Sequence, residues 1–172
     1  MIKARIAKYS QILFLLCLSK GVYADFTGKV VKVLDGDTVE VLNNGRPERV
    51  RLIGIDAPES GQPFGTKAKQ HLLNLVGNRQ VDVISNSVDR YGRSLGQLVV
   101  NVPLPASVTT YPIYVNYEMV SSGLAWAYRF DNKPTDTIAA DLESKAKSNK
   151  VGLWSAPGAV EPWKWRHTHQ KQ

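Results

Sequence analysis

Apolar, β-branched residues are concentrated in residues 26–34 and again in 38–42, and the two stretches are separated by Asp35-Gly36-Asp37. Such stretches favour β-strands, and an Asp-Gly pair between them is a turn signal. The pattern therefore predicts a hairpin over 26–42. A second turn at Asn43-Asn44-Gly45 is followed by a third predicted strand over 49–55.

The periodicity then changes to that of a helix. Between Thr66 and Val76 the apolar residues Ala68, Leu72, Leu75 and Val76 recur at helical spacing, and Gly77 follows as a stop signal. Two further strands are predicted over 81–87 and 94–100, joined by Asp89-Arg90-Tyr91-Gly92-Arg93.

Two helices are predicted in the last third of the chain, over 116–122 and over 136–149. In the longer helix, Ile138, Leu142 and Ala146 are expected to face inward. Glu143 and Lys147 are expected to form an i,i+4 pair on its surface.

The order of these elements predicts the fold class. Five strands with a helix between the third and fourth, and helices after the fifth, are typical of an α+β protein built on a five-stranded OB-type Greek-key barrel with three helices. Residues 101–112 contain three prolines with Ser and Thr and are predicted to be a loop insertion.

The first 24 residues have the layout of a cleaved signal peptide. Three basic residues precede the apolar core Ile12–Leu18, and positions 22 and 24 suit cleavage after Ala24. The apolar core is far shorter than the roughly 20 residues that span a bilayer, which argues against a membrane anchor. We therefore expect three regions: a signal peptide (1–24), a globular domain (25–156) and a basic, Trp-containing C-terminal tail (157–172). The protein is expected to be exported, to the periplasm or to the medium.

This segment changes the meaning of the net charge. The chain has 22 Lys and Arg and 15 Asp and Glu, a net charge of +7, which suggests nucleic acid or an anionic membrane as partner. Cleavage after Ala24 removes four basic residues and leaves a net charge of +3. The only cysteine, Cys17, is lost as well, so a disulfide framework and a cysteine-built zinc site are excluded. The loss of four basic residues also weakens the case for a membrane-surface protein.

Four polar segments are candidates for chemistry: Asp35–Val39, Val50–Leu52, Ile55–Ser60 and Asp89–Arg93. Each segment alone has an ordinary explanation, as a turn, a solvated strand residue, a loop before a helix, or a hairpin connection. In combination, the hairpin and third strand bring Asp37 near the chain that leaves Ile55. We therefore expect Asp37, Asp56 and Glu59 at one end of the barrel.

These residue types suit chemistry at a phosphate group. Carboxylate and carbonyl oxygens are hard ligands that favour Ca²⁺, Mg²⁺ or Mn²⁺ over zinc or copper. Arg51 and Arg93 carry planar guanidinium groups that bind phosphate in a bidentate way. A metal flanked by arginines matches the needs of a phosphodiester transition state, whose extra negative charge must be neutralised.

At this point the sequence resembles a known family. The motifs above, together with Gly123–Tyr128 (GLAWAY) and Val151–Ser155 (VGLWS), are similar to those of the staphylococcal nuclease (thermonuclease) family, in order and over about residues 26–155. The resemblance implies the OB-type barrel with three helices. It also implies an endonuclease that cuts DNA and RNA, single strands preferentially, and leaves 3′-phosphate ends.

The resemblance implies a role for each matching residue. Asp37 and Asp56 match the Ca²⁺-binding carboxylates, with the backbone carbonyl of Ala57 as a further ligand; Mg²⁺ and Mn²⁺ are less favoured substitutes. Glu59 matches the residue that orients or deprotonates the attacking water, and Arg51 and Arg93 match the residues that hold the scissile phosphate.

Two aromatic residues also match the family pattern, and the chain departs from that pattern at residue 57 and over 101–112. Tyr91 and Tyr128 match aromatic positions around the nucleotide. Residue 57 is Ala where the type member has Thr, which leaves a backbone carbonyl unaffected, and 101–112 has no counterpart there.

An alternative from another functional class is a non-catalytic OB-type module that binds nucleic acid or protein. Such scaffolds typically lack the acidic or arginine positions, whereas this chain retains all five: Asp37, Arg51, Asp56, Glu59 and Arg93. The enzyme is therefore favoured. We expect a monomer with no membrane association after cleavage.

Overall fold

The computed structural model describes residues 26–104 and 109–169. The predicted signal peptide lies outside this range. The strands are β1 (Phe26–Val33), β2 (Thr38–Asn43), β3 (Arg46–Leu52), β4 (Ile55–Asp56), β5 (Gln80–Val88), β6 (Ser94–Pro103), β7 (Thr110–Tyr114), β8 (Trp126–Ala127), β9 (Arg129–Phe130) and β10 (Lys133–Pro134). The helices are α1 (Gly65–Val76), α2 (Val115–Ser121), α3 (Thr137–Ser148), the 3₁₀ turn η1 (Gly152–Ser155) and α4 (Pro162–His169).

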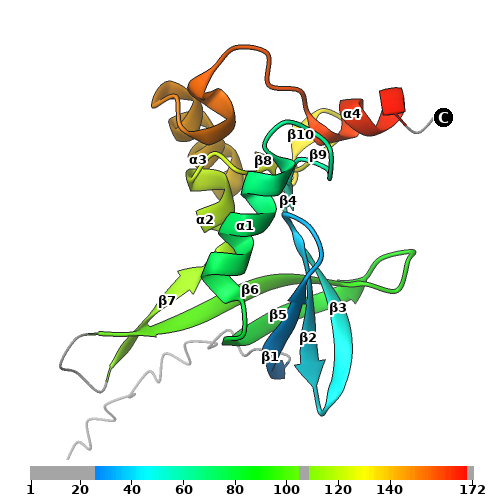
Figure 1. The fold of residues 1–172 in the computed structure, drawn as a ribbon, viewed down its shortest axis with the longest axis vertical. Coiled ribbons are helices and arrows are strands. Elements are labelled where there is room, and N and C mark those ends of the chain that lie inside the picture. The colour runs from blue at the N-terminus through cyan, green and yellow to red at the C-terminus, as the bar shows by residue number, and fades with distance from the viewer. Residues whose placement is uncertain (1–25, 105–108, 170–172) are drawn as a thin grey trace, which may run out of the picture.

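Five strands close into a barrel, which confirms the OB-type prediction. The main sheet has the order β3-β2-β1-β5-β6-β7, and a parallel pairing of β3 with β6 closes it where Val50 lies opposite Ser94. Figure 1 shows the barrel strands at one end of the molecule and the helices gathered at the other. Valines dominate the barrel interior: Val30, Val39, Val41, Val50, Val81 and Val83. Their branched side chains pack well on a pleated surface, which is why the β-branched pattern was informative.

The third predicted strand, 49–55, is divided in the structure. β3 ends at Leu52, and the chain resumes as β4, which pairs with β8 instead of continuing along the barrel wall. Gly54 lies between them with a φ of +77°, a backbone conformation that favours glycine. This bend takes Asp56 out of the barrel wall and toward the end of the molecule that carries the helices.

The prediction of a loop over 101–112 is wrong for most of that segment. β6 continues to Pro103, and β7 pairs antiparallel with it, from Val99 opposite Tyr114 to Pro103 opposite Thr110. Pro112 is tolerated because β7 is the last strand of the sheet, where a missing N–H need not break the ladder. The insertion therefore extends the sheet as a two-stranded arm.

The prediction of inward-facing residues on α3 is correct for Leu142 and Ala146 and wrong for Ile138. Ile138 is 54% exposed, while Ala139, Glu143 and Ala146 are buried. The pair of Glu143 with Lys147 exists, at 3.3 Å, but Glu143 is 2% exposed and is not a surface residue. The buried stripe begins at Ala139, whose N–H donates to the carboxylate of the N-cap residue Asp136 at 3.0 Å.

The C-terminal tail contains a helix that the sequence pattern did not predict. After η1 the chain runs to α4, whose Pro162 is buried. Within residues 26–104 and 109–169, no helix is long and apolar enough to cross a membrane.

Candidate active site

The turn between β1 and β2 positions the first carboxylate of the site. The backbone N–H of Asp37 donates to the Asp35 carboxylate at 3.0 Å, which orders the turn. Gly36 lies so close to its neighbours that a Cβ there would come within 2.7 Å of the Ala57 Cβ and 2.8 Å of the Ala68 Cβ. The turn therefore packs directly against the segment after β4 and against α1.

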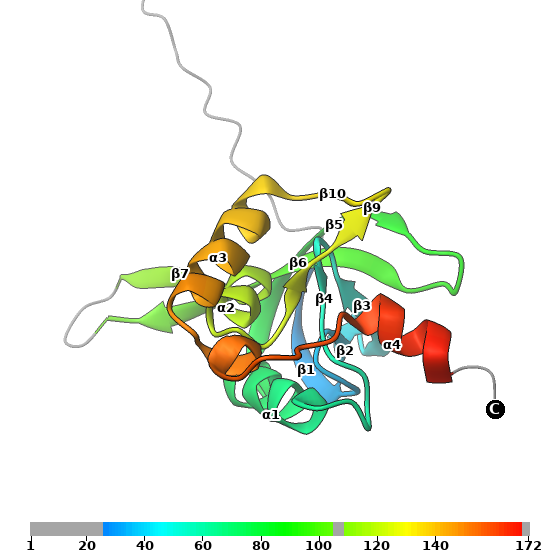
Figure 2. The same cartoon turned by 90° about the horizontal axis from the view of Figure 1, so that it is seen from above.

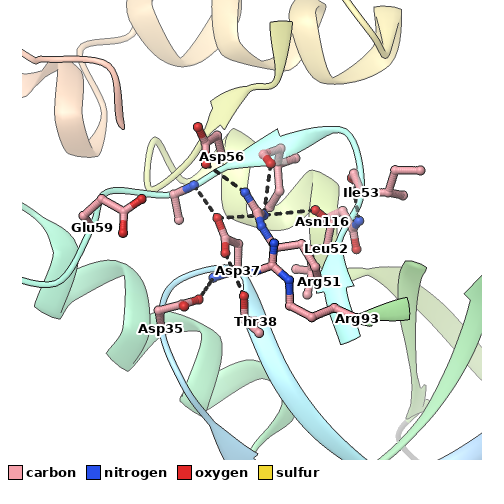
Figure 3. Close-up of polar contacts among 12 residues, drawn as sticks. Asp35, Asp37, Thr38, Arg51, Leu52, Ile53, Asp56, Glu59, Arg93 and Asn116 are labelled. Atoms are coloured by element: carbon pink, nitrogen blue, oxygen red, sulfur yellow. Dashed lines mark hydrogen bonds and ion pairs between the residues drawn. The ribbon is translucent and has the colours of Figure 1, made fainter. Parts of the chain in front are cut away.

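Asp37 is buried and fully hydrogen-bonded. One carboxylate oxygen accepts from the Ala57 N–H at 2.7 Å and the other from the Thr38 hydroxyl at 3.1 Å (Figure 3). Burial raises the pKa of Asp37 to about 7, although the positive charge of Arg51 acts to lower it. The negative charges of Asp35 and Asp56 add to the upward shift. A buried acid with this pKa is a common feature of functional sites, because its anionic form needs a further positive charge.

Arg51 joins the two buried aspartates. Its Nη1 lies 2.8 Å from the Asp37 carboxylate, and its Nη2 lies 2.8 Å from the Asp56 carboxylate. Nη1 also donates to the carbonyls of Leu52 and Ile55, each at 3.2 Å. Figure 3 shows the guanidinium of Arg51 between the two acids. The structure thus brings Asp37, Arg51 and Asp56 together as the motif spacing predicted.

Glu59 lies on the loop that follows β4, and its side chain is 38% exposed. The backbone N–H of Glu59 donates a hydrogen bond to the Gln62 side chain at 3.0 Å, which holds the loop. The Glu59 carboxylate is bound by Arg166 of α4, with 2.5 Å between Nη1 and Oε1. Arg166 is a site residue that sequence reasoning missed, because nothing in the spacing of the basic tail connects it to the carboxylates.

The loop between β5 and β6 positions Arg93 through Asp89. The Asp89 carboxylate accepts from the Tyr91 N–H at 2.9 Å, the Arg93 N–H at 3.0 Å and the Arg93 Nε at 2.7 Å. Burial opposes the Asp89 anion, but these hydrogen bonds together outweigh it and lower the pKa of Asp89. Among the described residues Arg93 forms no other ion pair, so its two Nη groups remain for a ligand.

These elements surround one cavity of about 600 Å³. The β1–β2 turn, residues 51–55 and 57–59 and most of the loop at 89–93 line it, together with Tyr128 and Arg166. Tyr91 is 74% exposed and Tyr128 is 37% exposed, so both rings are available for stacking. The volume is in the range of small-molecule sites.

The predicted metal ligands, Asp37, Asp56 and the backbone of Ala57, lie close together in this site. In the part of the chain that the structure describes, no group of three or more His, Cys, Asp or Glu side chains is arranged to hold a metal ion. The donor set is smaller: the carboxylates of Asp37 and Asp56, which share Arg51, and the backbone of Ala57, whose N–H already binds Asp37. The ligands are hard oxygens, and the ionised form of the buried Asp37 remains disfavoured even beside Arg51. The residues therefore fit a Ca²⁺-type ion with water as its remaining ligands.

Comparisons with known proteins agree with this geometry. The family model described as "Staphylococcal nuclease homologue" matches residues 49–156. The chain is 48% identical over 151 residues to "Micrococcal nuclease" of Shigella flexneri, covering 88% of this chain and 86% of that protein. It is 48% identical over 154 residues to "Protein ParB" of Escherichia coli, covering 90% and 86%. It is 36% identical over 167 residues to an "Uncharacterized endonuclease" of Haemophilus influenzae, covering 96% and 87%. With the closed barrel and the cluster of Asp37, Arg51 and Asp56, these matches establish that the chain belongs to the staphylococcal nuclease family.

Proposed function

We propose that this protein is an exported, Ca²⁺-dependent endonuclease that hydrolyses phosphodiester bonds of DNA and RNA with little sequence specificity and leaves 3′-phosphate ends. The nuclease activity itself follows from its family and its relatives. The observation that carries the finer proposal is the placement of Arg51 between Asp37 and Asp56, at the border of a cavity that Glu59 and Arg93 also line.

Each residue of the site has a role that its position supports. Glu59 is partly exposed at the cavity and accepts a proton from the water that attacks phosphorus. Arg93 binds non-bridging phosphate oxygens with its two Nη groups, and Arg51 supplies a second guanidinium at the same cavity. The bond between phosphorus and the 5′ oxygen breaks, the 5′ oxygen takes a proton from solvent, and the phosphate stays on the 3′ side.

Asp37, Asp56 and the backbone carbonyl of Ala57 are the residues that would hold Ca²⁺. When bound, the ion attracts a non-bridging oxygen and makes phosphorus more electrophilic. The raised pKa of Asp37 supports this assignment, because a nearby cation stabilises the ionised carboxylate. Mg²⁺ and Mn²⁺ also bind oxygen ligands, but Mg²⁺ demands a more regular geometry than two fixed carboxylates offer.

The exposed rings of Tyr91 and Tyr128 support a preference for single strands. Unpaired bases can stack on such rings, at about 1–3 kcal/mol per base and without sequence selection. The signal-like first 24 residues support export, and a monomer without membrane association suffices because one chain carries all the proposed site residues.

The proposal is tested with purified residues 25–172 and end-labelled DNA and RNA oligonucleotides. We expect single-stranded DNA to be cleaved in Ca²⁺, with weaker cleavage in Mg²⁺ or Mn²⁺ and none after a chelator is added. A 3′-phosphate is expected on the products, which phosphatase treatment detects as a mobility change. Binding without cleavage in all three cations would favour the non-catalytic OB-type module instead. Mass spectrometry of the exported protein tests cleavage after Ala24.

A further inference from the structure

The helix α4 reaches the active site from outside the part of the chain that matches the family model, which ends at residue 156. Figure 2 shows α4 beside β4, the strand that carries Asp56. Arg166 of α4 lies at the border of the same cavity as Arg51 and Arg93. The C-terminal segment therefore contributes a side chain to a site that the rest of the chain builds.

Arg166 binds two carboxylates at once. Its Nη1 lies 3.2 Å from Asp56 Oδ1 and 2.5 Å from Glu59 Oε1, and its Nη2 lies 2.9 Å from Asp56 Oδ2. Both oxygens of Asp56 are thus occupied by a guanidinium group, and one of them also accepts from Arg51. These are the carboxylates that the proposed function assigns to the metal ion and to the attacking water.

A divalent cation and Arg166 cannot use these oxygens independently. Asp56 is 1% exposed, so its charge is weakly screened and a nearby guanidinium lowers its affinity for another cation. For Asp56 to bind the metal ion, Arg166 must also release at least one of the two Asp56 oxygens that it now holds. Both effects have the same sign, and both oppose metal binding.

The docking of α4 does not depend on Arg166 alone. Trp163 packs edge-on against Trp126 with ring centroids 5.9 Å apart, and the Gln62 side chain donates to the Val160 carbonyl at 2.7 Å. Pro162 is buried at the start of the helix. A change at position 166 therefore removes the ion pairs while these other contacts keep the helix in place.

We propose that Arg166, which also binds Glu59, competes with the divalent cation for Asp56, so that the C-terminal helix sets the metal affinity of the active site. The proposal rests on the metal site of the proposed function. Because linkage is reciprocal, cation binding weakens the Arg166 ion pairs by the same factor by which Arg166 weakens cation binding. Arg166, once released, faces the cavity as a further guanidinium for the substrate phosphate.

The first experiment measures Ca²⁺ affinity without nucleic acid, by isothermal titration calorimetry on residues 25–172. Arg166→Gln is expected to tighten the Kd about tenfold or more, and Arg166→Lys, which keeps the charge but not the fork, less than Arg166→Gln. Lys164→Gln is the matched control, because Lys164 is on the same helix and contacts Glu161 instead of the site. Its Kd is expected to stay within about twofold of the unmodified protein.

The second experiment measures hydrogen exchange of residues 162–169 with and without Ca²⁺. When Ca²⁺ is added to the unmodified protein, protection of α4 is expected to fall but not to be lost, because the Trp163 and Gln62 contacts remain. In Asp56→Asn it is expected to stay constant. Constant protection in the unmodified protein with Ca²⁺ bound would overturn the competition. An equal or weaker Kd in folded Arg166→Gln, with measurable binding in the unmodified protein, would overturn the competition while leaving the proposed metal site intact. Absence of Ca²⁺ binding in both proteins would overturn the metal site and the competition together.

Discussion

Two buried acidic centres of this molecule differ in how their charge is balanced. Glu143 of α3 is 2% exposed and has two cationic partners, Arg129 at 2.5 Å and Lys147 at 3.3 Å. At the other centre Asp37 and Asp56 are 6% and 1% exposed and share Arg51. The first centre has one carboxylate for two cations, whereas the second has four carboxylates (Asp35, Asp37, Asp56 and Glu59) for the two guanidinium groups of Arg51 and Arg166.

The difference separates a structural ion pair from a functional one. A buried acid that is surrounded by cations stabilises only the fold, since no charge remains to attract a ligand. The excess at Asp37 and Asp56 costs stability in the absence of a cation, and Arg166 offsets part of it from α4. Excess negative charge among hard oxygen ligands is what a cation site needs before its ion binds.

The largest effect is expected from the residues that act on the substrate. Glu59→Gln and Arg93→Ala are each expected to lower kcat about 10²-fold or more, because each removes an interaction made in the transition state. Single-turnover cleavage of labelled single-stranded DNA measures the loss, and thermal unfolding should show a stability close to that of the unmodified protein.

Arg49→Ala is the matched control. Arg49 is on β3, its side chain is 55% exposed, and among the described residues its ion-pair partner is Glu40, at 3.4 Å. Full activity in either site variant would contradict the mechanism.

An intermediate effect is expected at the Glu143 centre. Glu143→Gln leaves Arg129 and Lys147 without their shared anion, and the free energy of unfolding should fall by about 2 kcal/mol, since both cations are partly solvated. Urea unfolding measures it, with Glu40→Gln as a control expected to lose about 0.5 kcal/mol or less. Cleavage per folded molecule should not change. A loss of kcat would show that the two centres are coupled.

The smallest effect is expected at Asp37 and depends on pH. The carboxyl ionises near 3.8 when unfolded and near 7 when folded, so between these values the folded chain retains a proton that the unfolded chain has lost. The free energy of unfolding should therefore fall as pH rises from about 4 to 7. Asp37→Asn should remove that decline and be more stable than the unmodified protein at pH 8 by about 1 kcal/mol, in metal-free buffer.

Urea unfolding at pH 5 and pH 8, with and without Ca²⁺, measures this effect. Ca²⁺ should restore stability to the unmodified protein at pH 8 and do nothing for Asp37→Asn. Identical pH dependence in the two proteins would contradict an excess of negative charge at Asp37.

The barrel could be predicted from sequence because its signals are local. The β-branched stretches of β1, β2, β5 and β6 and the turns between them were visible in short windows, and the structure confirms these strands within a few residues. Errors occurred where tertiary contacts overrode local pattern. The Pro-rich segment became β7 because β6 offered a free edge. Ile138 is exposed because α3 turns Ala139, Glu143 and Ala146 inward, where Glu143 pairs with Arg129.

The candidate site divides in the same way. Asp37, Arg51 and Asp56 lie on neighbouring elements of one barrel end, so motif spacing was enough to bring them together. Arg166 lies 110 positions from Asp56 and reaches it only because α4 docks against Trp126 and the 59–62 loop. No periodicity in the tail encodes that docking.

The sequence by itself determined the barrel, the family and the residue types of the active site, because strand alternation, turn residues and short polar motifs are local properties of the chain. Only the tertiary structure decided the charge balance at each centre. Which cations a buried carboxylate meets depends on which side chains pack beside it, and this packing paired Glu143 with Arg129 and Lys147 and brought Arg166 to Asp56 and Glu59.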